Sequence, residues 1–253
     1  MATVPSMVTP RRSALGVSLS GLAAAPGPAG VAAAGRNAAI AEHVVLLGDS
    51  IFDNQAYVRG GPDVLAHLRA HLPAGWRATL AAVDGSVASG VPHQLGQVPQ
   101  EATRLFVSAG GNDALRSEGA LGEAARSVGE ALARLSNLVE QFYQDYRAML
   151  EAVLARGLPT ALCTIYDPRF PDALRQRLAI TGLALFNDMI LREAFRHGLP
   201  VIDLRLVCSE AADFANPIEP SVQGGRKIAA AITRLATEHN FQQRRATIYT
   251  EGA

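Results

Sequence analysis

The stretch VVLLGDSIFDN, residues 44–54, indicates how this chain folds. Four large apolar residues, Val44 to Leu47, run directly into a Gly-Asp-Ser turn, and the sequence then becomes polar. A short apolar run that ends abruptly in a turn is typical of a parallel strand buried on both faces. The stretch therefore predicts a central strand with Ser50 at its carboxyl end.

Further apolar runs follow, and helical patterns separate them. Four more strands are expected at residues 76–83, 104–110, 160–166 and 201–204. Helices are expected at residues 63–72, about 121–156, about 172–197 and about 221–239. This alternation predicts an α/β fold of right-handed βαβ units, with about five parallel strands between two layers of helices. Ligands bind beyond the carboxyl ends of such strands, so Ser50, Gly85 and Asn112 are expected on one face.

Composition limits the classes of function. The chain has 253 residues, of which 49% are hydrophobic, and this suits one main domain, placed at residues 41–240. Its 23 basic and 23 acidic side chains balance, so nothing predicts a nucleic-acid partner, and no apolar run approaches the length of a membrane span. Cys163 and Cys208 lie in apolar surroundings and are expected to be buried, reduced thiols without a metal.

The two ends of the chain are expected to lie outside this domain. Residues 1–40 are rich in Ala, Gly, Pro and Ser, which predicts a disordered or signal-like extension. Arg11-Arg12 followed by a weak apolar stretch would suit an export signal, whereas a merely disordered extension would carry no targeting signal. A cytoplasmic location is therefore expected, with export as the alternative. Residues 241–253 are expected to form a C-terminal tail.

Three strand ends carry residues suited to nucleophilic chemistry. A serine hydroxyl attacks an acyl carbon only if a base takes its proton and donors stabilise the oxyanion. Ser50 can supply the hydroxyl and its own backbone N–H, Asn112 in AGGND a carboxamide donor, and Gly85 in AVDGSVASG a bare N–H. Each segment by itself also suits an ordinary turn or helix cap.

Together, in this order, these segments resemble the blocks of the GDSL, or SGNH, family of serine esterases and lipases. GDS is similar to the first block, DGSVASG to the second and GGND to the third, and the resemblance spans about residues 44–236. It implies a flavodoxin-like three-layer fold and ester hydrolysis through an acyl-serine, without cofactor or metal. It further implies Ser50 as nucleophile, with Gly85 and Asn112 in the oxyanion hole.

The last block of the family, Asp-x-x-His-Pro-Ser, differs here. The matching stretch is NPIEPSVQGG, with Asn216 and Glu219 at the positions of the Asp and the His. Our first hypothesis makes Glu219 the base, its pKa raised by burial beside neutral Asn216, with Asp49 and Asn216 in supporting roles. A second makes His93 the base, because it follows the second block on the correct side of the sheet. A third has a site that binds without catalysis.

These observations predict a serine esterase that acts on a small or medium acyl ester, a small-molecule substrate. A non-catalytic protein that binds an acyl or carbohydrate ligand on the same fold is the alternative. The sequence leaves the oligomeric state open.

Overall fold

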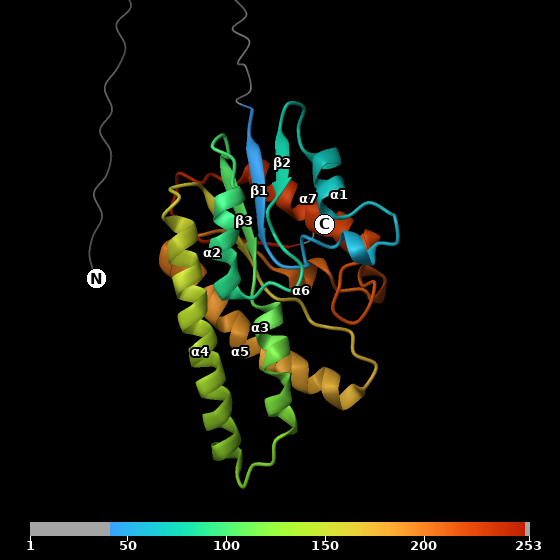
Figure 1. The fold of residues 1–253 in the computed structure, drawn as a ribbon, viewed down its shortest axis with the longest axis vertical. Helices are drawn as coiled ribbons and strands as arrows, with labels where there is room; N and C mark the ends of the chain where they lie inside the picture. The colour runs from blue at the N-terminus through green and yellow to red at the C-terminus, as the bar shows by residue number, and fades with distance from the viewer. Residues whose placement is uncertain (1–40, 251–253) are drawn as a thin grey trace, which may run out of the picture. The chain divides into compact units, whose positions relative to one another are not determined.

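A six-stranded parallel sheet forms the centre of residues 41–250, the part of the chain that the computed structural model describes. The strands lie in the order β2-β1-β3-β4-β5-β6 (Figure 1). They are β1 (His43–Gly48), β2 (Arg77–Leu80), β3 (Arg104–Ser108), β4 (Thr160–Cys163), β5 (Val201–Ile202) and β6 (Ile248–Tyr249). Every pairing is parallel, and Val44 of β1 pairs with Ala78 on one side and Arg104 on the other.

The sheet has one strand more than the sequence predicted. Ile248 and Tyr249 pair with β5, so residues expected to be a tail extend the sheet. A two-residue strand is too short to produce a recognisable alternation of apolar and polar side chains. The expectations for residues 1–40, and residues 251–253 of the expected tail, lie outside the described residues.

Seven α-helices connect and cover the strands of the described part. They are α1 (Val64–His71), α2 (Val91–Gln94), α3 (Gly111–Arg116), α4 (Val128–Leu154), α5 (Ala173–His197), α6 (Leu204–Val207) and α7 (Val222–Glu238). As predicted, Asp172 caps α5, its side chain accepting a hydrogen bond from the Arg175 N–H. The helix predicted from about residue 121 begins later, because Ser127 caps α4 and residues 118–122 form a separate 3₁₀ turn, η4.

Two hydrophobic layers confirm the three-layer arrangement. Successive residues of β1 point to opposite faces, so Val44 and Leu46 pack against α1, α6 and α7 on one side. Val45 and Leu47 pack against α2, α4 and α5 on the other. These side chains are fully buried, and burial of each contributes about 1.5–3 kcal/mol to stability. No helix of residues 41–250 has the length and hydrophobicity that crossing a bilayer requires.

The approach of β1 to β3 brings two of the predicted site segments together. Gly48 ends β1 with φ of +127°, and a Cβ there would lie 1.7 Å from the carbonyl oxygen of Ser108 in β3. The Asp49 N–H donates to the same oxygen at 3.1 Å. The strands β2 and β3 lie on opposite sides of β1. The crevice where ligands bind in such folds therefore opens between the carboxyl ends of β1 and β3.

Candidate active site

Ser50 and Glu219 meet at the carboxyl end of the sheet, although 169 positions separate them in sequence. The Ser50 hydroxyl donates a hydrogen bond to Oε1 of Glu219 at 3.1 Å. Both residues are buried, with 6% and 5% of their surfaces exposed. A hydroxyl that already points its proton at a carboxylate has the geometry that proton transfer requires.

Burial changes the acidity of Glu219. Loss of hydration raises the pKa of Glu219 from 4.5 to about 7, the hydrogen bond from Ser50 opposes this, and the charge of Asp84 adds to it. Its second oxygen, Oε2, is buried and has no hydrogen-bond partner among the described residues. A carboxyl group with a pKa near 7 is half ionised at neutral pH, so it can take up a proton and return it.

Asp49 lies beside Ser50 and is also buried. Its Oδ1 accepts a hydrogen bond from the Ile51 N–H at 3.2 Å, which helps to fix the turn after β1. Burial raises the pKa of Asp49 to about 8, the Ile51 N–H lowers it, and the negative charge of Glu219 raises it further. Asp49 is therefore largely uncharged at neutral pH, which spares Glu219 the repulsion of a second anion.

Asn112 and the turn at Gly85 lie next to each other. The Asn112 side-chain amide donates to the carbonyl oxygen of Ser86 at 3.0 Å, which leaves its second amide hydrogen for a ligand. Gly85 is exposed and adopts φ of +76°. The backbone N–H groups of Ser50 and Gly85 form no hydrogen bond among the described residues. Asn112 lines the same pocket as Ser50, whereas Gly85 is not part of that lining.

Gln94 is a buried residue that the sequence analysis missed. Its side chain accepts a hydrogen bond from the Gly48 N–H at 2.8 Å and donates to the Gly48 carbonyl oxygen at 2.7 Å. It also donates to the Ser86 hydroxyl at 3.2 Å. Gln94 thus joins the end of β1, before Ser50, to the turn that contains Gly85. Nothing in the local pattern indicates this role, because its partner Gly48 lies 46 positions away.

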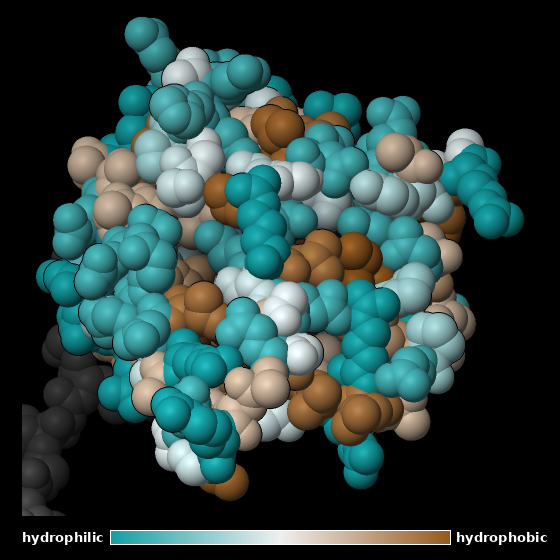
Figure 2. Space-filling model, turned by 60° about the horizontal axis from the view of Figure 1, so that its bottom comes forward, coloured by the Kyte–Doolittle hydropathy of each residue, from teal (hydrophilic) through white to brown (hydrophobic). Residues whose placement is uncertain are grey.

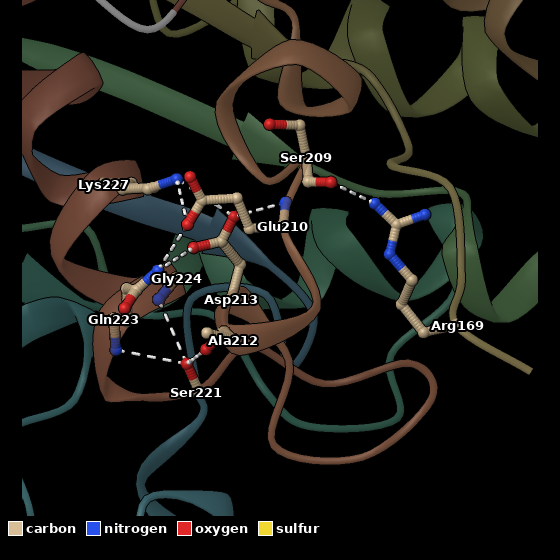
Figure 3. A network of polar contacts seen from close by, with 9 residues as sticks. All are labelled: Arg169, Ser209, Glu210, Ala212, Asp213, Ser221, Gln223, Gly224 and Lys227. Carbon is tan, nitrogen blue, oxygen red and sulfur yellow. Dashed lines mark hydrogen bonds and ion pairs between the residues drawn. The ribbon is translucent and has the colours of Figure 1, made fainter.

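An ion pair between Asp213 and Lys227, here called the Asp213 clasp, holds the loop that carries Glu219 (Figure 3). Asp213 is fully buried, and its Oδ2 lies 3.1 Å from Nζ of Lys227 in α7. The Glu210 N–H donates to the same oxygen at 2.9 Å, and Gln223 donates to Oδ1 at 3.0 Å. The carbonyl oxygen of Asp213 accepts from the Ser221 N–H at 2.8 Å. Both ends of the loop are therefore fixed to the start of α7.

The side chain of Asn216 supports this loop by accepting hydrogen bonds from the loop's backbone. Its Oδ1 accepts hydrogen bonds from the N–H groups of Ile218 at 2.9 Å and Glu219 at 3.0 Å. The carboxyl oxygen of Glu219 that lacks a partner is thus not bonded to Asn216. Asn54 adds a second link, because its side-chain amide donates to the carbonyl oxygen of Pro220 at 3.1 Å.

Other residues that the sequence singled out do not line the pocket that contains Ser50. His93 is exposed in α2 and does not line the pocket that contains Ser50. Cys163 and Cys208 are buried in the core, as predicted. Within residues 41–250, no three His, Cys, Asp or Glu side chains are grouped so that they could hold a metal ion.

A largely apolar pocket opens from Ser50 between α3, α4 and α5. Its empty volume is about 1030 Å³, including solvent at its mouth. Ser50, Asn112 and Glu219 provide polar groups, and residues of α4 and α5 provide apolar walls. The strands point their carboxyl ends downward in Figure 1, and Figure 2 brings this end forward. Hydrophobic side chains there form several patches among polar ones. Such a pocket can accept an apolar ligand whose polar atoms meet Ser50.

Comparison with known proteins yields one family and one fold. The model of a family described as GDSL-like Lipase/Acylhydrolase matches residues 46–241. No curated protein sequence matches the chain.

Similar solved structures include lipases. The lipase Lip_vut3 from a goat rumen metagenome has a TM-score of 0.61 at 19% identity, over 79% of this chain and 99% of that one. Phospholipase A1 from Streptomyces albidoflavus has a TM-score of 0.58 at 16% identity, over 78% and 99% of the two chains. An extracellular lipase from Streptomyces rimosus has a TM-score of 0.54 at 19% identity, over 74% and 96%. At these identities the likeness concerns the fold.

Proposed function

The chain belongs to the GDSL-like lipase/acylhydrolase family, and from this premise we propose that it hydrolyses an acyl ester through an acyl-serine at Ser50, with Glu219 as the base. The observation that carries the proposal is the hydrogen bond from the Ser50 hydroxyl to the buried Glu219 carboxylate at 3.1 Å. This contact lies at one end of an apolar pocket, where an ester carbonyl can approach the hydroxyl.

Acylation begins when Oγ of Ser50 attacks the ester carbonyl carbon and its proton passes to Glu219. The carbonyl oxygen becomes an oxyanion, which the Ser50 N–H and the Asn112 amide stabilise inside the pocket. The Gly85 N–H is the third donor, in the turn outside the pocket lining that Asn112 contacts through Ser86. When the tetrahedral intermediate collapses, the bond to the alcohol breaks and Glu219 gives its proton to the departing oxygen. In deacylation, a water molecule takes the place of the alcohol, Glu219 accepts its proton, and the acid leaves as Ser50 regains its hydrogen.

The pKa of Glu219 supports this choice of base. Aspartate and glutamate in water are weak bases because their pKa values lie near 4, whereas burial raises the pKa of Glu219 to about 7. In this proposal Glu219 takes the place of the histidine found in the last block of the family, and Asn216 takes that of the aspartate. An aspartate in place of Asn216 would add a charge close to Glu219, which fits the presence of a neutral side chain. His93, exposed and outside the pocket lining, is the weaker candidate.

Labelling with a fluorophosphonate tests the proposal, because such reagents react with an activated serine. The proposal expects one labelled residue, Ser50, and turnover of short p-nitrophenyl esters that Ser50→Ala abolishes without lowering the melting temperature. Labelling at another residue, or turnover that survives in S50A, contradicts it.

A second candidate is a non-catalytic binder of acyl ligands. The absence of a histidine from the described lining of the pocket favours it. It expects ligand binding that raises the melting temperature, with neither labelling of Ser50 nor release of p-nitrophenol. A fluorophosphonate adduct on Ser50 together with turnover eliminates this candidate.

A further inference from the structure

The pocket at Ser50 continues as an apolar chamber between α4 and α5. Leu135 and Val139 of α4 and Leu183 and Phe186 of α5 line it. The α5 lining also includes Ala179 and therefore follows the spacing of one helix face. An aliphatic chain is the ligand that such walls match, since burial of apolar surface is the main favourable contribution they offer.

Gly182 keeps this chamber open. It lies on the same face of α5 as Ala179 and Phe186 and contributes to the lining. A Cβ placed on Gly182 would meet no atom within 4 Å. Glycine in the middle of a helix costs about 0.5–1 kcal/mol relative to alanine, so a side chain here would favour the helix and occupy the chamber. The chamber is thus open beside α5 because Gly182 has no side chain.

Charges restrict what the chamber can hold. Its described lining has three carboxyl groups, those of Asp49, Glu118 and Glu219, and no Lys, Arg or His, and Asp49 is largely uncharged at neutral pH. Glu118 is already paired with Arg175, whose guanidinium donates to its two carboxylate oxygens at 2.5 and 2.8 Å. A carboxylate or phosphate at the far end of a bound chain would therefore be buried without a cation on the described lining.

The acyl part of an ester is the part that stays in the chamber through both chemical steps. The alcohol must take a proton from Glu219, depart and make way for water, so it needs the open side of the site. The acyl group remains bound to Ser50 until that water attacks. Leu115 and Leu185 line the pocket and are 39% and 38% exposed, which marks the open side.

We propose that this chamber binds the uncharged aliphatic acyl chain of the substrate and that Gly182 is the residue that determines which chain lengths are accepted. The inference rests on the proposed function. Up to the end of the chamber, each added methylene should raise kcat/KM about fourfold, because its burial is favourable and the walls are apolar.

The test compares Gly182→Leu with a matched control, Gly129→Leu. Gly129 lies in α4, is exposed, and its added Cβ would meet only the Ser127 hydroxyl at 3.7 Å. Rates are measured on p-nitrophenyl butyrate, octanoate and the singly charged suberate monoester. We expect G182L to lower kcat/KM for octanoate at least about 30-fold while butyrate changes less than about threefold. G129L should behave as wild type, and wild type should prefer octanoate to suberate at least about 100-fold.

The outcomes separate this inference from the proposed function. Ester turnover with labelled Ser50, but with the same chain-length dependence in G182L and G129L, overturns the inference and leaves the function standing. A rate that follows the length of the alcohol in a series of acetates, or an equal preference for suberate, also overturns it. If no ester is turned over, 1-octanol replaces the substrates: a melting temperature raised in wild type and G129L but not in G182L supports the chamber, and equal shifts in all three refute it.

Discussion

Glu219→Gln should stabilise the protein at alkaline pH while it abolishes turnover. The variant keeps the size of the side chain and an oxygen that can accept from Ser50, but it has no titratable proton. In the wild type, the pKa of Glu219 rises from 4.5 when unfolded to about 7 when folded. The folded state thus binds this proton more tightly, and the stability that depends on it is present below pH 4.5 and lost as the pH rises to 7.

The size of the effect follows from the shift. A difference of about 2.5 pH units at about 1.4 kcal/mol per unit amounts to roughly 3 kcal/mol. The free energy of unfolding of E219Q, compared with wild type, should therefore improve by roughly 3 kcal/mol between pH 4.5 and pH 8. Comparing the two pH values removes the cost of burying the amide, which is the same at both. Asp49 also titrates but is present in both proteins, so most of its contribution cancels.

Urea denaturation at both pH values measures this change, and ester hydrolysis from pH 5 to 9 measures the role in catalysis. Since the base must be ionised, wild-type kcat/KM should fall about tenfold per pH unit below pH 7. E219Q should lose at least about 100-fold at pH 8. A pH-independent stability difference, or a flat activity profile from pH 5 to 8, would refute the reasoning about this carboxyl group.

Three further variants test separate parts of the structure. Asn112→Ala should lower kcat about 100-fold to 1000-fold with little change in KM, because it removes an oxyanion donor, and an unchanged kcat would contradict that role. Lys227→Met should lower the free energy of unfolding, measured by urea denaturation, by about 3–5 kcal/mol. The double variant with Asp213→Asn should recover part of this loss. A loss below about 1 kcal/mol in Lys227→Met would argue against the Asp213 clasp. Gly48→Ala should destabilise by more than about 4 kcal/mol, because its Cβ would lie 1.7 Å from a β3 carbonyl oxygen, whereas the control Gly96→Ala, with open space around its Cβ, should stay near wild type.

Much of the fold could be predicted because local patterns specify it. The apolar run at residues 43–48 forms β1, and the helix expected at about residues 172–197 forms α5 with Asp172 as its cap. Strand ends were less predictable: β4 stops at Cys163 and β5 at Ile202, short of their apolar runs. Pairing partners decide where a strand ends, and these lie far away in sequence.

The site could be predicted only in part, for the same reason. Ser50, Asn112 and Glu219 follow strands or lie in a motif, and they share one pocket. Gln94 follows no motif, and its contacts to Gly48 depend on how α2 packs against β1. The Asp213 clasp could likewise not be predicted from the sequence, because a buried ion pair between a loop and a helix leaves no periodic pattern.

The acidic lining of the chamber also affects how a turnover would end. In the proposed reaction a neutral ester enters, and the acid that hydrolysis forms loses its proton to solvent and becomes an anion next to Glu219, with no cation on the described lining to retain it. Repulsion between like charges then pushes the product acid toward bulk solvent. Inhibition by accumulated product should accordingly be weak above pH 7, where Glu219 is ionised, and stronger in acid, where it is neutral.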